Sequence, residues 1–196
     1  MTLQPAEAAG HVAAAAAGDR RAWEALVTAY SGLIWAIIRN HRLRHGDAAD
    51  VSQTTWLRLV ENIERLTDPG RVGAWLATTA RRECLRLQAR TRRLVLVDGH
   101  PDPASDPLYQ GEPGPDAGLL RAERNDEVRR VVELLPVRER QLMGMLMLDP
   151  APSYEEISAA MGIPVGSIGP TRRRCLEKLK GLVPADGMSG ARANSS

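Results

Sequence analysis

Apolar residues recur every three or four positions along three stretches of the N-terminal half, a spacing that predicts amphipathic helices. The first stretch follows Asp19, a residue that favours the N-cap position, and ends near Ile38. The second follows Asp47, which we expect to cap it, and the third covers about Val72 to Arg92. Helices of this length predict a small bundle over residues 14–95.

The C-terminal half repeats the helical period in shorter pieces. A helix is predicted from Val137 to Leu148, and a capping box of Ser153 and Glu156 opens the next one, which Gly162 ends. These pieces predict a second small helical domain over residues 119–183. Because no alternating strand pattern competes with them, the predicted fold class is all-α.

Pro170 leaves open how the last helix begins. If Ser167 is the N-cap, Pro170 falls in the first turn, where proline is tolerated. If the helix begins at Val165 instead, Pro170 costs an interior hydrogen bond and the helix bends at Gly169 and Pro170. One face of this helix carries Ile168, Cys175 and Leu179, which should pack on the preceding helix. The opposite face carries Pro170, Arg173 and Arg174.

Charge is segregated along the chain. Its net charge is only +2, but residues 71–93 contain seven arginines and one glutamate, a local excess of +6. Residues 96–118 are rich in proline, glycine and acidic residues, and predict a flexible acidic linker. The alanine-rich residues 1–13 are expected to be frayed or disordered, and residues 184–196 disordered.

Several classes of protein are disfavoured. The two cysteines, Cys84 and Cys175, lie far apart, with no CxxC and no histidine at ligand spacing, so neither a metal site nor a cofactor is expected. Each cysteine belongs to an apolar pattern, which favours a buried, inert thiol. No nucleophile–base pairing points to an enzyme. No apolar run approaches ~18 residues and no basic leader is present, so we expect no membrane insertion and a cytoplasmic protein.

A helix, a tight glycine-containing turn and an arginine-rich helix form the arrangement that places its second helix in the DNA major groove. Arg173 or Arg174 could donate two hydrogen bonds to guanine, whereas Arg172 and Lys178 suit phosphates. The alternative is a solvated basic face without a ligand.

The ordered motifs resemble the extracytoplasmic-function (ECF, group IV) sigma factors of RNA polymerase, within the sigma-70 family. In the first domain these are "GDRRAWEALVTAYSGLIWAI", "DAADVSQTTWLRLVENI" and "VGAWLATTARRECLRLQARTRR". In the second they are "LLPVRERQLMGMLML", "PSYEEISAAMGIPVGSI" and "RCLEKLK". The resemblance implies that residues 14–95 correspond to sigma region 2 and residues 119–183 to region 4.

The resemblance implies an initiation factor that binds core polymerase through the clamp helices of its largest subunit and the flap of its second-largest subunit. The residues implied at the clamp interface are Asp50, Gln53, Thr54 and Leu57; a core contact remains the alternative for Leu57. Those implied to hold the non-template strand of the −10 element are Arg71, Arg81, Arg82, Arg86 and Arg90. Trp75 could stack on a base, but its place in the apolar pattern favours a core anchor.

In region 4, the residues implied to read the −35 element are Ser167, Thr171, Arg173 and Arg174. The chain departs from the family's common pattern at Arg82 and Arg86, where relatives often carry Asn and Asp, and around Gly169 to Thr171. An anti-sigma protein is a further implied partner, beside promoter DNA. Two rival functions remain: a stand-alone helix-turn-helix regulator, which would bind duplex DNA without polymerase, and a helical adaptor with no nucleic-acid role.

Overall fold

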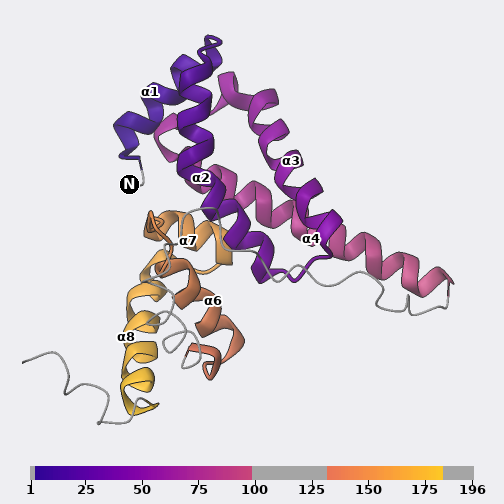
Figure 1. Cartoon of the computed structure of the whole chain (residues 1–196), viewed down its shortest axis with the longest axis vertical. Helices are drawn as coiled ribbons and strands as arrows, with labels where there is room; N and C mark the ends of the chain where they lie inside the picture. The colour runs from indigo at the N-terminus through magenta and orange to yellow at the C-terminus, as the bar shows by residue number, and fades with distance from the viewer. Residues whose placement is uncertain (1–2, 99–131, 183–196) are drawn as a thin grey trace, which may run out of the picture.

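A computed structural model describes residues 3–98 and 132–182, which are predominantly helical and contain no β-strand, so the all-α prediction is confirmed. Figure 1 shows the N-terminal helices α1 (Pro5–Ala16), α2 (Arg20–Asn40), α3 (His45–Asn62) and α4 (Val72–Asp98), with the short turns η1 (Ile63–Arg65) and η2 (Pro69–Arg71) between α3 and α4. The C-terminal helices are α6 (Val137–Leu146), α7 (Tyr154–Met161) and α8 (Val165–Leu182). None of the described helices is long and apolar enough to cross a membrane.

Two predicted N-caps had different outcomes. The carboxylate of Asp19 accepts a hydrogen bond from the backbone N–H of Arg21 at 2.8 Å, which confirms the start of α2. Asp47, in contrast, lies in the first turn of α3, and the N-cap position falls on Arg44, whose side chain makes no capping bond. An acidic residue in the first turn interacts favourably with the helix dipole without capping the helix. The predicted N-cap at Asp47 therefore lies three residues after the observed one at Arg44.

The prediction that residues 1–13 are frayed or disordered is wrong from Pro5 onwards. Helix α1 packs on α2 and on η2, and it buries Ala8, Val12 and Ala15. Alanine has the highest helix propensity, and its small side chain lets two helices approach closely, so a segment that looked low in complexity forms part of the bundle.

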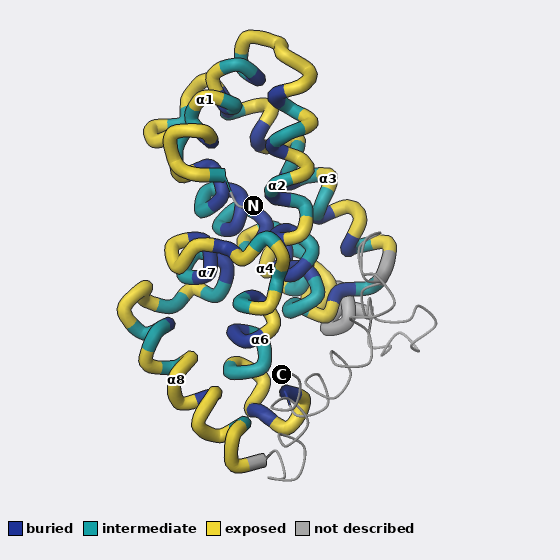
Figure 2. The backbone as a smooth tube through the Cα atoms, turned by 60° about the vertical axis from the view of Figure 1, so that its left-hand side comes forward, coloured by how far each residue is buried: buried dark blue, intermediate teal, exposed yellow. Residues whose placement is uncertain are grey.

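One hydrophobic core joins the N-terminal bundle to α7 and α8. Leu26 and Ile34 of α2, Leu76 of α4, Ile157 of α7 and Ile168 of α8 are all completely buried within one cluster. Figure 1 shows α7 lying beside α4, α6 contacts α2, and Figure 2 shows buried backbone on both sides of this junction. The C-terminal helices are therefore docked on the first bundle.

Helix α7 has the predicted ends. Ser153 Oγ accepts from the N–H of Glu156 at 3.2 Å, and the Ser153 N–H donates to Glu156 Oε2 at 2.7 Å, so the capping box is confirmed. Gly162 follows α7 with φ of 65°, the left-handed conformation that glycine adopts without strain.

Helix α8 begins at Val165, so the predicted start near Ile168 with Ser167 as N-cap is wrong. Pro170 lies inside the helix and not in its first turn, which is where the second predicted form places it. The Ser167 hydroxyl caps nothing; it donates to the carbonyl oxygen of Pro164 at 2.7 Å. Ile168 packs in the main core as expected. Cys175 and Leu179 instead pack against a second cluster, made by Val132, Leu135 and Met143, so the expected contact of these two with α7 is wrong.

Two helix ends were misplaced by a few residues. Helix α4 continues to Asp98, three residues into the predicted linker that began at residue 96, whereas α6 ends at Leu146 and not at Leu148. The rest of the predicted linker (99–118), residues 119–131 of the second predicted domain, and the predicted tail (184–196) lie outside the described residues.

Candidate nucleic-acid interface

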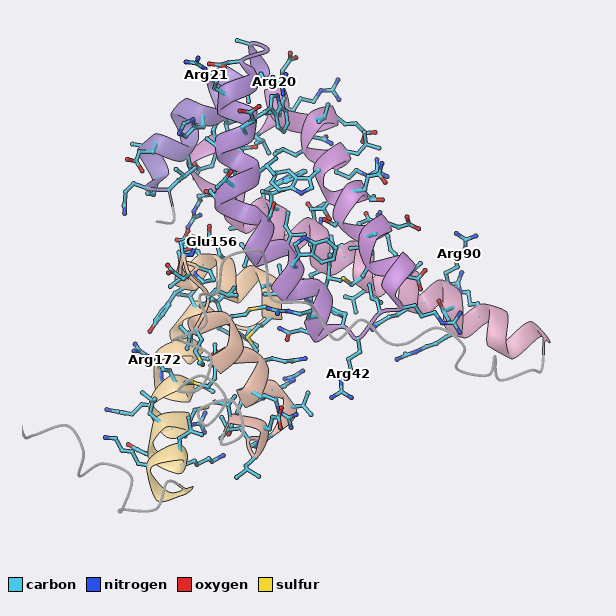
Figure 3. The ribbon with its side chains drawn as sticks, in the orientation of Figure 1. Arg20, Arg21, Arg42, Arg90, Glu156 and Arg172 are labelled. Carbon is cyan, nitrogen blue, oxygen red and sulfur yellow. The ribbon has the colours of Figure 1, made fainter. Side chains whose placement is uncertain are left out.

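Helix α4 exposes a row of arginines on the side away from the core. Arg82, Arg86 and Arg90 are all exposed, and Figure 3 shows Arg90 pointing away from the bundle. Arg86 Nη1 also contacts Glu83 Oε1 at 2.7 Å, an i,i+3 pair that leaves the arginine more than half accessible. The row presents positive charge along the helix, which suits the phosphates of a nucleic-acid strand.

A pocket of about 300 Å³ opens between the end of α3 and the middle of α4. Its walls are Arg58 and Asn62 of α3 and Trp75, Thr79, Arg82, Glu83 and Arg86 of α4. Trp75 is half-buried, so one part of its ring packs against the core while another part lines the pocket. The expectation that Trp75 is a core anchor therefore describes only part of its surroundings. An aromatic wall with a cationic rim can receive a flat, polar ring such as a nucleobase.

Sequence reasoning missed Arg58 and Asn62. Both face the pocket from α3, and Arg58 Nη1 contacts Glu61 Oε2 at 2.9 Å. An arginine and an asparagine at i and i+4 mark one helix face, but only the packing of α3 on α4 places that face beside Trp75.

Two other predicted −10 residues face the C-terminal helices. Arg71 Nε donates to Glu155 Oε2 of α7 at 2.9 Å, and its guanidinium also pairs with Asp68 at 3.8 Å. The hydrogen bond from Arg71 lowers the pKa of the Glu155 carboxyl. Arg81 is half-buried beneath the Gly162 turn. The structure thus divides the five predicted −10 arginines into three on the solvent-facing side of α4 and two that α7 and its C-terminal turn engage, of which Arg71 stays exposed and Arg81 is half-buried.

The basic face of α8 is accessible. Arg172, Arg173 and Arg174 are all exposed, and Figure 3 shows Arg172 pointing outward from the helix. Pro170 is exposed as well. Lys178 Nζ instead lies 2.8 Å from Glu139 of α6, which ties the end of α8 to the neighbouring helix.

The two predicted hydroxyl readers on α8 are engaged in local hydrogen bonds. Thr171 Oγ1 donates to the Ser167 carbonyl at 2.7 Å and accepts from Arg174 Nη2 at 3.3 Å, while the Ser167 hydroxyl bonds to Pro164. Both residues are half-buried. Their oxygens can still accept a further hydrogen bond, whereas the three arginines offer free donors.

Helix α3 presents an apolar patch to solvent. Leu57 is 54% exposed and Val60 is 55% exposed, so neither is a core residue. Asp50 and Gln53 are exposed on the same helix, and Thr54 is half-buried. The helical period alone would have placed Val60 beside the buried stripe. Two large apolar side chains beside polar ones form a surface that fits a protein partner.

The buried titratable groups belong to the core. Burial raises the pKa of the Cys84 thiol to about 12, and burial also raises the pKa of Cys175. Burial raises the pKa of Glu156 too, opposed by the hydrogen bonds from Ser153. Within residues 3–98 and 132–182, no three His, Cys, Asp or Glu side chains are grouped so as to hold a metal ion.

Comparison with known proteins gives matches along most of the chain. Residues 26–94 match the Sigma-70 region 2 family. The ECF RNA polymerase sigma factor EcfG of Rhodopseudomonas palustris is 31% identical over 140 residues, which cover 71% of this chain and 73% of that protein. The ECF RNA polymerase sigma factor SigD of Mycobacterium tuberculosis is 25% identical over 194 residues, with 95% and 89% covered.

Two solved structures share the fold. One is CnrH in complex with the cytosolic domain of CnrY, with a TM-score of 0.53, 20% identity, and coverage of 93% of this chain and 99% of that one. The other is the sigma factor RpoE in complex with the anti-sigma factor NepR from Bartonella quintana, with a TM-score of 0.53, 19% identity, and coverage of 84% and 98%.

Proposed function

Because the chain belongs to the ECF RNA polymerase sigma factors, whose member EcfG it matches at 31% identity, we propose that it directs initiation by holding the −10 element on α4 and the −35 element on α8. The observation that carries this proposal is the pocket beside Trp75, which is rimmed by Arg82 and Arg86. Opening the −10 element costs a few kcal/mol, and capture of an extruded base together with phosphate contacts offsets that cost.

On α4, the exposed arginines Arg82, Arg86 and Arg90 hold the phosphates of the non-template strand. A base of that strand enters the pocket, where the ring of Trp75 offers a stacking surface. Arg71 and Arg81 extend the phosphate-binding row once they are free of α7.

On α8, Arg173 and Arg174 meet guanine edges in the major groove, and Arg172 with Lys178 meets the flanking phosphates. A bidentate contact of this kind is worth about 1–3 kcal/mol of discrimination between bases. Ser167 and Thr171 complete the −35 surface as hydrogen-bond acceptors.

On α3, the apolar patch of Leu57 and Val60, with Asp50, Gln53 and Thr54 beside it, binds the clamp helices of the polymerase largest subunit. The second domain binds the flap of the second-largest subunit. The exposure of Leu57 and Val60, each above one half, supports this surface. An anti-sigma protein is a further proposed partner. One structural neighbour, RpoE, was solved in complex with an anti-sigma factor, and the other, CnrH, was solved with the cytosolic domain of CnrY. A pull-down that recovers polymerase alone would count against that partner.

Transcription on random fragments of genomic DNA tests the proposal, because every promoter sequence is then offered to the protein at once. Core polymerase is supplied with the chain, and transcript 5′ ends are sequenced. We expect new start sites that share a −35 and a −10 motif. The double variant Arg82→Ala/Arg86→Ala should keep its affinity for core polymerase. In its complexes with promoter DNA, however, the thymines of the −10 element should no longer react with permanganate, because the element stays double-stranded. No enrichment of specific starts over core polymerase alone would refute the proposal.

A further inference from the structure

Helix α7 lies across the N-terminal part of α4 and makes a largely apolar contact with it. Ile157 is completely buried and Ala160 nearly so, and both belong to the same cluster as Leu76 and Ala77 of α4. Gln141 of α6 adds a hydrogen bond from its Nε2 to the Asn40 carbonyl of α2 at 3.0 Å. The C-terminal helices therefore dock on the first bundle through an apolar interface that a hydrogen bond between α6 and α2 reinforces.

This interface engages two arginines of the proposed −10 surface. The Arg71 guanidinium is bound by the Glu155 carboxylate, with 2.9 Å between Nε and Oε2. Arg81 lies against Gly162 so closely that a Cβ on this glycine would be 2.7 Å from Arg81 Nη2. A carboxylate on one guanidinium and a backbone turn on the other occupy the sides that phosphates would need.

A slot at Gly73 fixes the position of α7. The Glu156 side chain, held by Ser153, lies directly over Gly73, so that a Cβ at residue 73 would collide with its carboxylate and would be 2.7 Å from Tyr30 Cε1. Figure 3 shows Glu156 at this junction between α7 and the first bundle. Only glycine leaves room there, because Glu156 cannot move away without breaking its hydrogen bond to the Ser153 N–H.

We propose that α7 is an intramolecular cover that competes with the −10 strand for Arg71 and Arg81. In the docked arrangement Arg71 stays exposed but pairs with the Glu155 carboxylate, and Arg81 is half-buried, while Arg82, Arg86 and Arg90 of α4 and the basic face of α8 are exposed. The inference rests on the proposed function, since it assumes that α4 binds the −10 strand. The apparent affinity for that strand is then the affinity of the undocked form multiplied by the fraction of molecules in which α7 is undocked.

Two substitutions should open the cover from opposite sides. Gly73→Ala fills the slot, and Glu155→Arg turns the pairing with Arg71 into a repulsion. Their controls are Gly10→Ala, where an added Cβ has nothing within 4 Å, and Glu133→Arg, which makes the same charge change at an exposed position. The probe is a fluorescent random-sequence single strand of about 30 nucleotides, because phosphate contacts do not depend on sequence.

We expect Gly73→Ala and Glu155→Arg to lower the Kd of the full chain for this strand by at least about threefold relative to their controls. Equal affinities within each pair would overturn the inference. If no variant binds the strand, the proposed function itself fails and the inference falls with it.

Zero-length crosslinking gives a second readout that does not depend on opening variants. In Arg71→Lys, a carbodiimide should join Lys Nζ to the Glu155 carboxylate, and the single strand should suppress this product. The double variant Arg71→Lys/Glu155→Gln, which lacks the carboxylate, is the control and should give no such product. A bound strand that leaves the crosslink from residue 71 unchanged would contradict competition.

Discussion

Replacing Pro170 by serine should stabilise the protein. Pro170 is the sixth residue of α8, which begins at Val165, so its missing N–H leaves the Gly166 carbonyl without its i+4 donor. Serine restores this donor and removes the clash of the proline ring with the preceding turn. Pro170 is exposed, so the smaller side chain leaves no cavity in the core.

The size of the effect follows from three contributions. Proline costs about 3 kcal/mol relative to alanine inside a helix, and serine costs about 0.5 kcal/mol. Loss of proline also frees the unfolded chain, which offsets up to about 1 kcal/mol. We therefore expect Pro170→Ser to raise the free energy of unfolding by about 1.5 kcal/mol.

Urea denaturation followed by circular dichroism measures the change, and amide hydrogen exchange of α8 locates it. Pro164→Ser is the matched control, because Pro164 precedes α8 and its nitrogen has no helical partner to serve. An unchanged or lower stability of Pro170→Ser would show that the proline belongs to the first turn of a shorter helix. Selection of bound sequences from a duplex library should also give an altered −35 preference, because Pro170 lies on the exposed face with Arg173 and Arg174.

Arg82→Ala should weaken binding of a −10 single strand at every sequence and reduce the salt dependence of log Kd by about 0.7, the value for one phosphate contact, as titrations at several salt concentrations would measure. Leu57→Glu should abolish binding to core polymerase in a pull-down without lowering the melting temperature, because the side chain is 54% exposed; a loss of melting temperature would place it in the core instead. Cys84 should react with iodoacetamide at pH 8 only after denaturation, since burial raises its pKa to about 12, and rapid native labelling would refute this. The raised pKa of Glu156 gives stability that is fully present below its unfolded pKa and lost as pH rises through its folded pKa, so Glu156→Gln should flatten that part of a stability–pH curve measured by denaturation.

Periodicity and capping chemistry predicted the helices well where each signal was local. Asp19, Ser153 with Glu156, and Gly162 mark helix ends through hydrogen bonds or dihedral angles that involve only nearby residues. Asp47 failed because an acidic residue is favourable both at an N-cap and in a first turn, and the sequence does not distinguish the two positions.

Tertiary packing decided the features that the sequence misjudged. An alanine-rich segment has a weak apolar pattern, so the burial of Ala8 against α2 depends on a partner that periodicity does not reveal. The half-buried position of Trp75 and the exposure of Val60 likewise depend on how α3 and α4 meet. Engagement of Arg71 by Glu155 joins residues 84 positions apart, a separation that no local pattern reports.

The length of α4 gives strand binding a direction. Arg71 and Arg90 are separated by about 28 Å along the helix axis, at 1.5 Å per residue, and α7 with its C-terminal turn engages only the half from Arg71 to Arg81. A single strand would therefore be held first at the uncovered end, by Arg90 and Arg86, and would then advance toward Arg71 as it displaces α7. Contacts made early in promoter opening would belong to the far end of α4, and those completed last would belong to the end where Glu155 now lies.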